Sequence, residues 1–427
     1  MNNLIHFSLI INLILLSSLP VAADTYSLKT LHSFSKVDGW DPVSTLVSDS
    51  SGNLYGSTAT GGTYGKGTLF KIDADTHAFT SLFSFNGSSG ATPRGSLVID
   101  SHGSLFGTTQ YGGTNDEGTV FGFDTNSQVI NTLATFNGVN GVGPLGGLIA
   151  DSSGNMYGAT EYSAPFGTLN AAGVVFKISG DTHSFSILAS RNTVVNSNDL
   201  LDMTGRLVID SSGNIFGGTQ GGGTANHGSV FEIAADTKVL STIASIRGVG
   251  TIGPYGGLVI DAAGNLYGAT LNGGDGSLNH GAGGGLIFKI SASTHNLSIV
   301  STFDGVHGQS PYGDLVIDAS GNIFGTTARG GANDVGTIFE IAANSNKITT
   351  LWSFGVDNGG WYPYGGLHID SSGNLYGTNS IGGAYGDYGT VFELVRSVPE
   401  PASVVLIGLG SLALTFCYLV RFSRFNC

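Results

Sequence analysis

The stretch LVIDASGNIFG, residues 315–325, decides how this chain folds. An apolar run ending at Asp318 leads through a short polar turn, Ala319–Asn322, into a second apolar run that ends at Gly325. Two short apolar runs joined by a turn that contains glycine are typical of a β-hairpin. Gly321 can adopt the positive φ that such a tight turn requires. The stretch therefore predicts two short paired strands.

The same pattern occurs seven times along the chain. In each copy an aspartate is followed six residues later by an aromatic residue and then by a glycine. The aspartates are Asp49, Asp100, Asp151, Asp210, Asp261, Asp318 and Asp370, spaced 51, 51, 59, 51, 57 and 52 residues apart. A leucine stands three residues before each aspartate, and a phenylalanine always follows further on. Repetition at such a period predicts an architecture in which each copy is one structural unit.

Each copy contains four short segments with the pattern of strands. In the sixth copy these are Val300–Phe303, Asp314–Asp318, Ile323–Thr327 and Gly336–Ile341, and Lys347–Trp352 begins the next copy. A four-stranded unit with a period of about 50 residues is the signature of a propeller blade. The sequence therefore predicts an all-β fold, a seven-bladed β-propeller with four strands per blade.

The repeated positions also predict how the blades pack and how the ring closes. The leucine, aromatic and phenylalanine positions are expected to form the core between blades, and the glycine after each aromatic residue to let adjacent sheets approach closely. One extra strand, Tyr26–Phe34, precedes the first copy, and the last copy stops at Thr390–Leu394 with no strand after it. We expect the N-terminal strand to complete the last blade, because a closed ring leaves no open gap.

The composition excludes several classes of function. Asp and Glu total 30 and Lys and Arg 16, giving a net charge of −14, so nucleic acid is not an expected partner. The two cysteines, Cys417 and Cys427, lie at the extreme C-terminus. A disulfide framework and a thiolate metal site are therefore excluded from the repeats.

Residues 1–23 are predicted to be a signal peptide. The apolar stretch Leu4–Leu19 is followed by small residues at Val21 and Ala23 that fit a signal-peptidase site. Cleavage there would leave residues 24–397 as the seven-repeat propeller. The alternative is an uncleaved N-terminal anchor, since no Lys or Arg precedes the apolar stretch.

Residues 398–427 are predicted to be a sorting tail. Within them the uncharged stretch 402–420 would span roughly 28 Å as a helix, enough for a transmembrane helix that anchors the chain. Arginines follow the stretch at once, which marks the cytoplasmic side and leaves the rest of the chain outside. The residues of the predicted signal are Pro399, Glu400, Pro401, Arg421 and Arg424.

This tail resembles the PEP-CTERM sorting signal of Gram-negative bacteria in its Pro-Glu-Pro motif, hydrophobic helix and Arg-containing end. The resemblance implies recognition by an exosortase-type processing enzyme and placement at the cell envelope or cell surface, anchored or released after C-terminal processing. In that family the setting is often exopolysaccharide or biofilm matrix. The alternative is a plain C-terminal anchor preceded by a chance Pro-rich linker.

The repeats themselves also resemble known families. The Asp-x-x-Gly-Asn-Leu-Tyr hairpin is similar to the inner hairpin of NHL-type propellers. The full unit, with its Gly-Gly and Gly-Thr-Val-Phe segments, resembles the GloVer tandem repeats of bacterial surface proteins. This resemblance implies the propeller fold, and it assigns no activity to any residue.

Loop length varies on only one predicted face of the propeller. The long loops are Ser163–Gly173, Ala189–Thr204 and Gly273–Gly285, in blades three to five. Binding residues are often carried by variable loops on a rigid scaffold, so this face is the expected contact surface. Neutral drift in tolerant loops is the alternative.

Two sets of histidines could suggest a metal or catalytic site. His77, His183 and His295 share one turn position in separate blades, too far apart for one site. His227 and His280 lie in Asn-His-Gly segments of adjacent blades and could bind a metal with Asp275, although we expect them to be exposed loop histidines. The repeated aspartate is expected to be structural, because one Asp and one Asn per turn are too few ligands for calcium.

Carboxylates and aromatic residues could act on a glycan. Glu161, Asp199 and Asp202 are expected to lie near one another on the variable face and could form an acid–base pair, although the sequence does not set their distances. Aromatic residues in the links between blades are candidates for stacking on sugars, although we expect them to cap the blade cores instead. These aromatic residues are Trp40, Tyr255, Tyr312, Trp361 and Tyr364.

The sequence assigns no catalytic residue, metal site or cofactor, and it leaves the ligand-binding residues unknown. The expected function is an exported, envelope-anchored propeller that presents a binding face to extracellular polysaccharide or to envelope proteins. A carbohydrate-active enzyme, a glycan hydrolase or lyase, is the alternative, and it would require residues that break the repeat and converge near the axis. A purely structural surface component is the third hypothesis.

Overall fold

The structure is a computed structural model that describes residues 25–162, 173–190, 202–224, 226–247, 253–274, 276–278, 281–343, 345–355 and 359–397. Across these ranges the regular elements are strands, and no helix has the length and apolar character needed to cross a membrane. The predicted signal peptide, the predicted transmembrane helix at 402–420 and the five predicted sorting residues lie outside the described residues.

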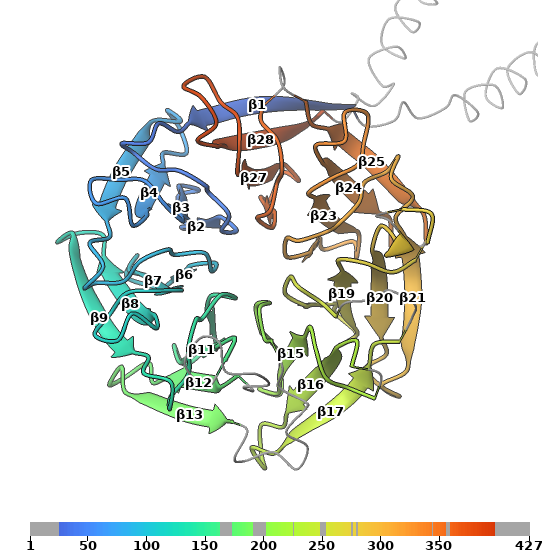
Figure 1. Cartoon of the computed structure of the whole chain (residues 1–427), viewed down its shortest axis with the longest axis horizontal. Coiled ribbons are helices and arrows are strands. Elements are labelled where there is room, and N and C mark those ends of the chain that lie inside the picture. The colour runs from blue at the N-terminus through green and yellow to red at the C-terminus, as the bar shows by residue number, and fades with distance from the viewer. Residues whose placement is uncertain are drawn as a thin grey trace, which may run out of the picture. The chain divides into compact units, whose positions relative to one another are not determined.

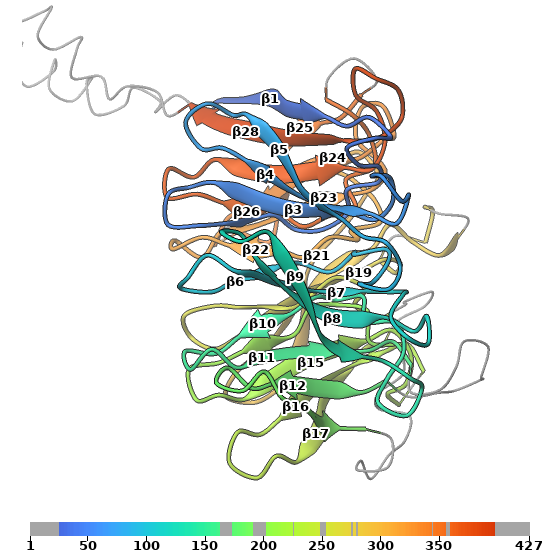
Figure 2. The same cartoon turned by 90° about the vertical axis from the view of Figure 1, so that its left-hand side faces the viewer.

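The chain divides into two units. Leu28–Leu394 is one compact unit, and the two ends, Met1–Ser27 with Val395–Cys427, form the other. The larger unit is a ring of seven sheets around a central axis, in the order of the chain (Figure 1). Viewed from the side, the loops that join the strands lie at the two ends of the ring (Figure 2).

Each blade is a sheet of four strands, which follow one another from the axis outward. Blades one to three are β2 (Val47–Ser48), β3 (Leu54–Thr58), β4 (Thr68–Ile72), β5 (Phe79–Ser84); β6 (Val98–Ile99), β7 (Leu105–Thr109), β8 (Thr119–Asp124), β9 (Val129–Thr135); and β10 (Ile149–Ala150), β11 (Met156–Ala159), β12 (Val175–Ile178), β13 (Phe185–Ala189). Blades four and five are β14 (Val208–Ile209), β15 (Ile215–Thr219), β16 (Ser229–Ile233), β17 (Leu240–Ser245); and β18 (Val259–Ile260), β19 (Leu266–Thr270), β20 (Leu286–Ile290), β21 (Leu297–Thr302). Blades six and seven are β22 (Val316–Ile317), β23 (Ile323–Thr327), β24 (Thr337–Ile341), β25 (Ile348–Ser353); and β26 (His368–Ile369), β27 (Leu375–Asn379), β28 (Thr390–Ser397), β1 (Thr25–Ser33). The predicted seven-bladed propeller is confirmed.

The N-terminal strand closes the ring as predicted. β1 is the outermost strand of blade seven and pairs with β28, so the first and last strands of the fold share one sheet. One boundary was wrong: Val300–Phe303 does not open blade six, because β21 is the outer strand of blade five. A tight turn after β20 folds β21 back onto it, with Ile290 opposite Leu297 in antiparallel register.

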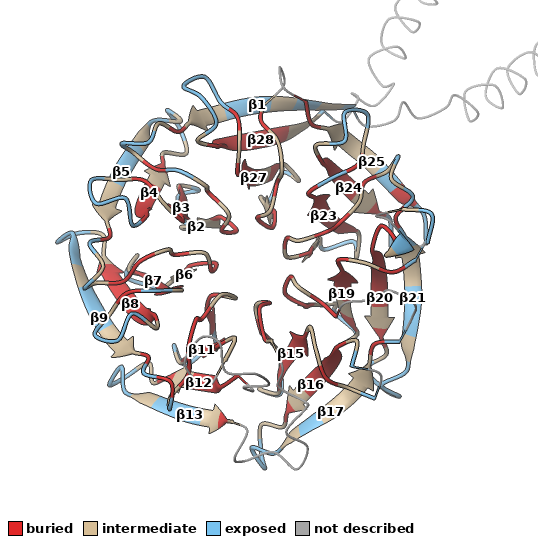
Figure 3. Cartoon of the chain, viewed as in Figure 1, coloured by how far each residue is buried: buried red, intermediate tan, exposed pale blue. Residues whose placement is uncertain are grey.

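The repeated positions form the cores between neighbouring blades. One such core combines Phe106, Val120 and Phe136 of blade two with Met156 and Phe176 of blade three. The phenylalanine of the strand next to the outermost is fully buried in every blade, whereas the outermost strands face solvent (Figure 3). Burying a phenylalanine side chain contributes about 1.5–3 kcal/mol, so these positions hold the blades together.

The glycine after each aromatic residue makes room within its own blade. A Cβ at Gly217 would lie 2.5 Å from Cζ of Phe231 and 2.6 Å from Cδ2 of Leu207, both of blade four. We expected this glycine to let adjacent sheets approach each other. That was wrong, because the side chains that a Cβ would meet belong to the same blade as the glycine. The ring of Phe231 lies over Gly217 on the paired strand and also packs against residues of the preceding blade, such as Tyr157 and Val175 of blade three.

The repeated aspartate has the predicted structural role. In blade one, Oδ1 of Asp49 accepts hydrogen bonds from the backbone N–H groups of Ser51 and Asn53 at 2.9 and 3.0 Å. Its Oδ2 accepts from Nδ2 of Asn53 at 2.8 Å and from the hydroxyl of Tyr55 at 3.0 Å. Partial burial would raise the pKa of Asp49, but these hydrogen bonds outweigh it and lower the pKa below its ordinary value.

Candidate functional site

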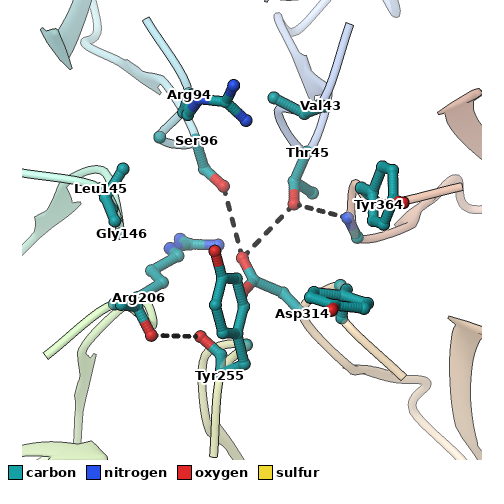
Figure 4. A pocket seen from close by; sticks show the side chains of 16 residues that line it. Val43, Thr45, Arg94, Ser96, Leu145, Gly146, Arg206, Tyr255, Asp314 and Tyr364 are labelled. Atoms are coloured by element: carbon teal, nitrogen blue, oxygen red, sulfur yellow. Dashed lines mark hydrogen bonds between the residues drawn. The ribbon is translucent and has the colours of Figure 1, made fainter. Parts of the chain in front are cut away.

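The links that lead into the seven inner strands meet at one mouth of the central axis. Each link has a Pro-x-Gly-x-Leu pattern, with Met203 in place of proline in blade four and Ser44 in place of glycine in blade one. Residues of all seven links line a cavity of about 300 Å³ (Figure 4). A second axial cavity, of about 620 Å³, is lined by the seven inner strands. The antiparallel strand order places the links on the same face as the variable loops.

One polar layer forms the floor of the first cavity and borders the second. It consists of the residues immediately before the repeated leucines: Thr45, Ser96, Gly147, Arg206, Gly257, Asp314 and Gly366. Thr45, Arg206 and Asp314 line both cavities. Arg206 and Asp314 are the only charged residues at these seven positions. The repeat therefore departs from its pattern in the layer that faces the axis.

Asp314 binds residues from several blades at this floor. Its Oδ1 accepts a hydrogen bond from the backbone N–H of Gly257 at 2.6 Å. Its Oδ2 accepts from the hydroxyls of Thr45 and Ser96, each at 3.3 Å (Figure 4). Oγ1 of Thr45 in turn accepts from the backbone N–H of Gly366 at 3.2 Å. The carboxylate is therefore held by three donors of the protein, and the layer links five of the seven blades.

Arg206 is the other charged residue of the floor, and its side chain points toward the middle of the cavity, beside Tyr255 (Figure 4). Its Nε is buried and has no hydrogen-bond partner within the described part of the chain. Among those residues Arg206 also makes no ion pair. Its positive charge is therefore not neutralised by a direct contact, whereas the carboxylate of Asp314 is held by three hydrogen-bond donors.

Three tyrosines form an arc around the cavity above this floor. Tyr255, Tyr312 and Tyr364 occupy the same link position in three consecutive blades. Their ring centroids are 5.0 and 5.1 Å apart, with near-perpendicular rings. Burial raises the pKa of Tyr255 and of Tyr364 above the ordinary value of a phenol, which is already protonated at neutral pH. These hydroxyls can therefore donate a hydrogen bond. We name these three residues the tyrosine arc.

The other aromatic candidates lie further out. Trp361 continues from the arc through Tyr362, with ring centroids 6.3 Å apart between these two and 6.2 Å from Tyr362 to Tyr364. Trp40 instead packs edge-to-face on Tyr388 at 5.7 Å and does not line the cavity. The expectation that the link aromatics cap blade cores was therefore wrong for the tyrosine arc, because its rings line the axial cavity.

Arg94 completes the mouth opposite the arc. It occupies the same link position in blade two, and its side chain is 39% exposed. Its Nη2 lies 3.5 Å from Oδ2 of Asp41, a long contact that leaves most of its donors available. Asp41 also accepts a hydrogen bond from the hydroxyl of Ser380.

Two of the three predicted carboxylates lie near this mouth, and Asp199 is outside the described residues. Burial raises the pKa of Glu161; a hydrogen bond with Tyr162 opposes the shift, and the negative charge of Asp202 adds to it. Burial also raises the pKa of Asp202. The charge of Glu161 also acts on Tyr255, so Glu161 lies within electrostatic range of one residue of the tyrosine arc.

The structure describes some of the histidines that the sequence singled out. His77, His183 and His295 each lie in a turn with φ of 52 to 56° in a different blade, as expected for separate rim positions. His280 and Asp275 are outside the described residues, as is most of the loops Ser163–Gly173 and Ala189–Thr204. In the described ranges no group of three or more His, Cys, Asp or Glu is placed to hold a metal ion.

Sequence reasoning missed the charged residues of the cavity: Arg94, Arg206 and Asp314. The signal was present, because aligning the seven copies shows that Arg206 and Asp314 are the only charged residues at the position before the repeated leucine. What was missing was the knowledge that this position faces the axis.

Comparisons with known proteins support the fold and the sorting tail. The Gloeobacter/Verrucomicrobia repeat matches residues 19–171 and 203–405. The PEP-CTERM protein-sorting motif matches residues 397–421, which contain Pro399, Glu400, Pro401 and Arg421. No curated protein matches the chain.

Two solved structures share the fold at low identity. One is the extracellular domain of a protein described as a hybrid two-component system of B. thetaiotaomicron, at 10% identity and a TM-score of 0.57, with 86% of this chain covered and 39% of that one. The chain thus spans well under half of that relative. The other is an oligogalacturonate lyase of Vibrio parahaemolyticus, at 10% identity and a TM-score of 0.53, with 88% of this chain and 98% of that one covered. At such identity the similarity concerns the fold alone.

Proposed function

This chain belongs to the Gloeobacter/Verrucomicrobia repeat family and is an exported propeller with a PEP-CTERM sorting signal, and on that premise we propose that its axial cavity binds an extracellular polysaccharide. The sorting motif implies processing by an exosortase-type enzyme. The proposal further places the propeller, residues 24–397, outside a Gram-negative cell, with the helix 402–420 anchoring it until the tail is processed.

The tyrosine arc is the observation that carries this proposal. Three rings line one cavity, with their hydroxyls available as donors. Aromatic rings pack well on the apolar faces of sugars, and a small number of polar groups then fixes the orientation of the ligand. The three tyrosines thus lie in a cavity to which the links of all seven blades contribute.

Replacing the arc is expected to weaken saccharide binding. The triple variant Tyr255→Ala, Tyr312→Ala, Tyr364→Ala loses three stacking surfaces, which should weaken binding at least about tenfold. Glycan-array binding of the purified exported protein measures the effect. Trp40→Ala is the matched control, because Trp40 is 40% exposed but does not line the cavity.

Binding that survives in the triple variant would contradict the assignment of the cavity. An array on which neither the unaltered protein nor the variant binds would instead favour an envelope protein as the partner.

A carbohydrate-active enzyme, a hydrolase or lyase, is the second candidate, and the raised pKa of Glu161 beside Asp202 favours it. A carboxyl group whose pKa is raised keeps its proton to a higher pH and can act as a general acid toward a leaving sugar oxygen. In that case Glu161→Gln should lower the release of new chain ends by about 100-fold or more while saccharide binding persists. Glu232→Gln, in β16 and away from the cavity, is the control. Absence of any released ends from the unaltered protein would exclude this candidate for the polymers assayed.

A further inference from the structure

The cavity has an excess of hydrogen-bond donors and of positive charge among its lining side chains. The donors are the guanidinium groups of Arg94 and Arg206 and the hydroxyls of the tyrosine arc. The only lining carboxylate, Asp314, already accepts from three donors of the protein. The two guanidinium groups can only donate, so a ligand that binds them must supply acceptors.

This balance is the reverse of that of the whole chain. The protein has 16 basic and 30 acidic residues, yet its axial cavity is lined by two arginines and one aspartate. Exposed acidic residues repel anions, so an arginine pair at the convergence point of seven blades is the feature that would overcome this repulsion locally.

Both arginines also have N–H donors that a ligand could bind. Nε of Arg206 is buried without a hydrogen-bond partner in the part of the chain that the structure describes. Arg94 has one long contact, 3.5 Å, to Asp41. A guanidinium has five N–H donors in a planar fork that matches the two oxygens of a carboxylate. A buried donor without a partner is costly, so a ligand acceptor in this cavity would satisfy it.

We infer that the saccharide bound here is acidic: a sugar ring lies against the tyrosine arc while its carboxylate is held by Arg94 and Arg206. The ligand class is thus a polymer or oligomer that contains uronic acids. A cavity of about 300 Å³ is at the lower end of small-molecule sites, so it would receive one chain end or a single sugar residue rather than a folded polymer. This inference rests on the proposed saccharide binding.

The test compares three ligands of equal chain length on the full-length exported protein by titration calorimetry. They are a polyuronate, the same polymer with its carboxyl groups reduced to alcohols, and a sulfated neutral polymer. We expect the polyuronate to bind at least about tenfold more tightly than its reduced form, because charge-assisted hydrogen bonds are roughly twice as strong as neutral ones.

The arginine variants then separate charge from stacking. The double variant Arg94→Gln, Arg206→Gln should bind the polyuronate no more tightly than it binds the reduced polymer. Lys238→Gln removes an exposed positive charge far from the cavity lining and should leave all affinities unchanged. Melting curves of each variant show whether it is folded.

Each outcome decides the matter. Equal affinity for the polyuronate and its reduced form would overturn the acidic-ligand inference while leaving saccharide binding intact. Binding of the sulfated polymer alone would overturn the assignment of a carboxylate. Binding of none of the three would overturn both this inference and the proposed function for these polymers.

Discussion

Deleting residues 25–34 is expected to lower the melting temperature of the protein by about 10 °C or more. The deletion removes β1, which is the outer strand of blade seven and covers β28. It also removes Phe34, which is fully buried in the core shared with Leu46, Phe70 and Val391. Loss of one buried phenylalanine typically costs about 3–5 kcal/mol, and the unpaired backbone of β28 adds to this.

Specific contacts at the closure explain why the effect should exceed that of losing an ordinary terminal strand. The backbone N–H of Phe34 donates to the carbonyl of Gly389 at 2.9 Å, and Nζ of Lys29 lies 3.8 Å from Oε2 of Glu393. The ring of Phe34 meets that of Phe70 edge-to-face at 5.2 Å, across the junction of the last and first blades. The deletion removes these contacts, which join blade seven to blade one and so close the ring.

The control for this experiment deletes only residues 25–27, which are mostly exposed. We expect that deletion to change the melting temperature by no more than about 2 °C. Calorimetry or circular dichroism measures both. A 25–34 deletion that melts like the unaltered protein would show that the ring does not depend on this strand.

The double variant Gly107→Ala, Gly217→Ala is expected to lower the free energy of unfolding by about 2–6 kcal/mol. At each position the new Cβ would lie within 2.8 Å of both a buried phenylalanine ring and the repeated leucine. Overpacking of this kind costs about 1–3 kcal/mol per site, and the two sites are in different blades, so the costs should add.

A matched glycine isolates the packing effect from the general effect of Gly→Ala. At Gly276 a new Cβ would meet no atom of the described residues closer than 4.0 Å, and its φ is not in the positive region. Gly276→Ala should therefore leave stability unchanged or raise it by up to about 1 kcal/mol. Chemical denaturation measures all three proteins. If the double variant were as stable as Gly276→Ala, the repeated aromatic-Gly pair would not be set by packing.

The residues of the candidate site could be predicted from the sequence only in part. The tyrosine arc was visible as three aromatic residues in links, but a link residue can cap a blade core as readily as it can face the axis. Asp314 was visible only as the residue before a repeated leucine. Its partners Thr45 and Ser96 are 269 and 218 residues away in the sequence, so no local pattern could join them.

The sequence by itself determined the seven blades, the four strands of each and the strand that closes the ring. Strand patterns, glycine turns and the Asp-centred hairpin act within about ten residues, and each was repeated seven times, so every local signal was confirmed by its copies. Only the tertiary structure decided which side chains face the axis. That choice depends on the closure of a ring whose blades are about 50 residues apart in the sequence. Closure brings Arg94, Arg206, Asp314 and the tyrosine arc into one cavity. Among these residues only Tyr312 and Asp314 belong to the same local motif.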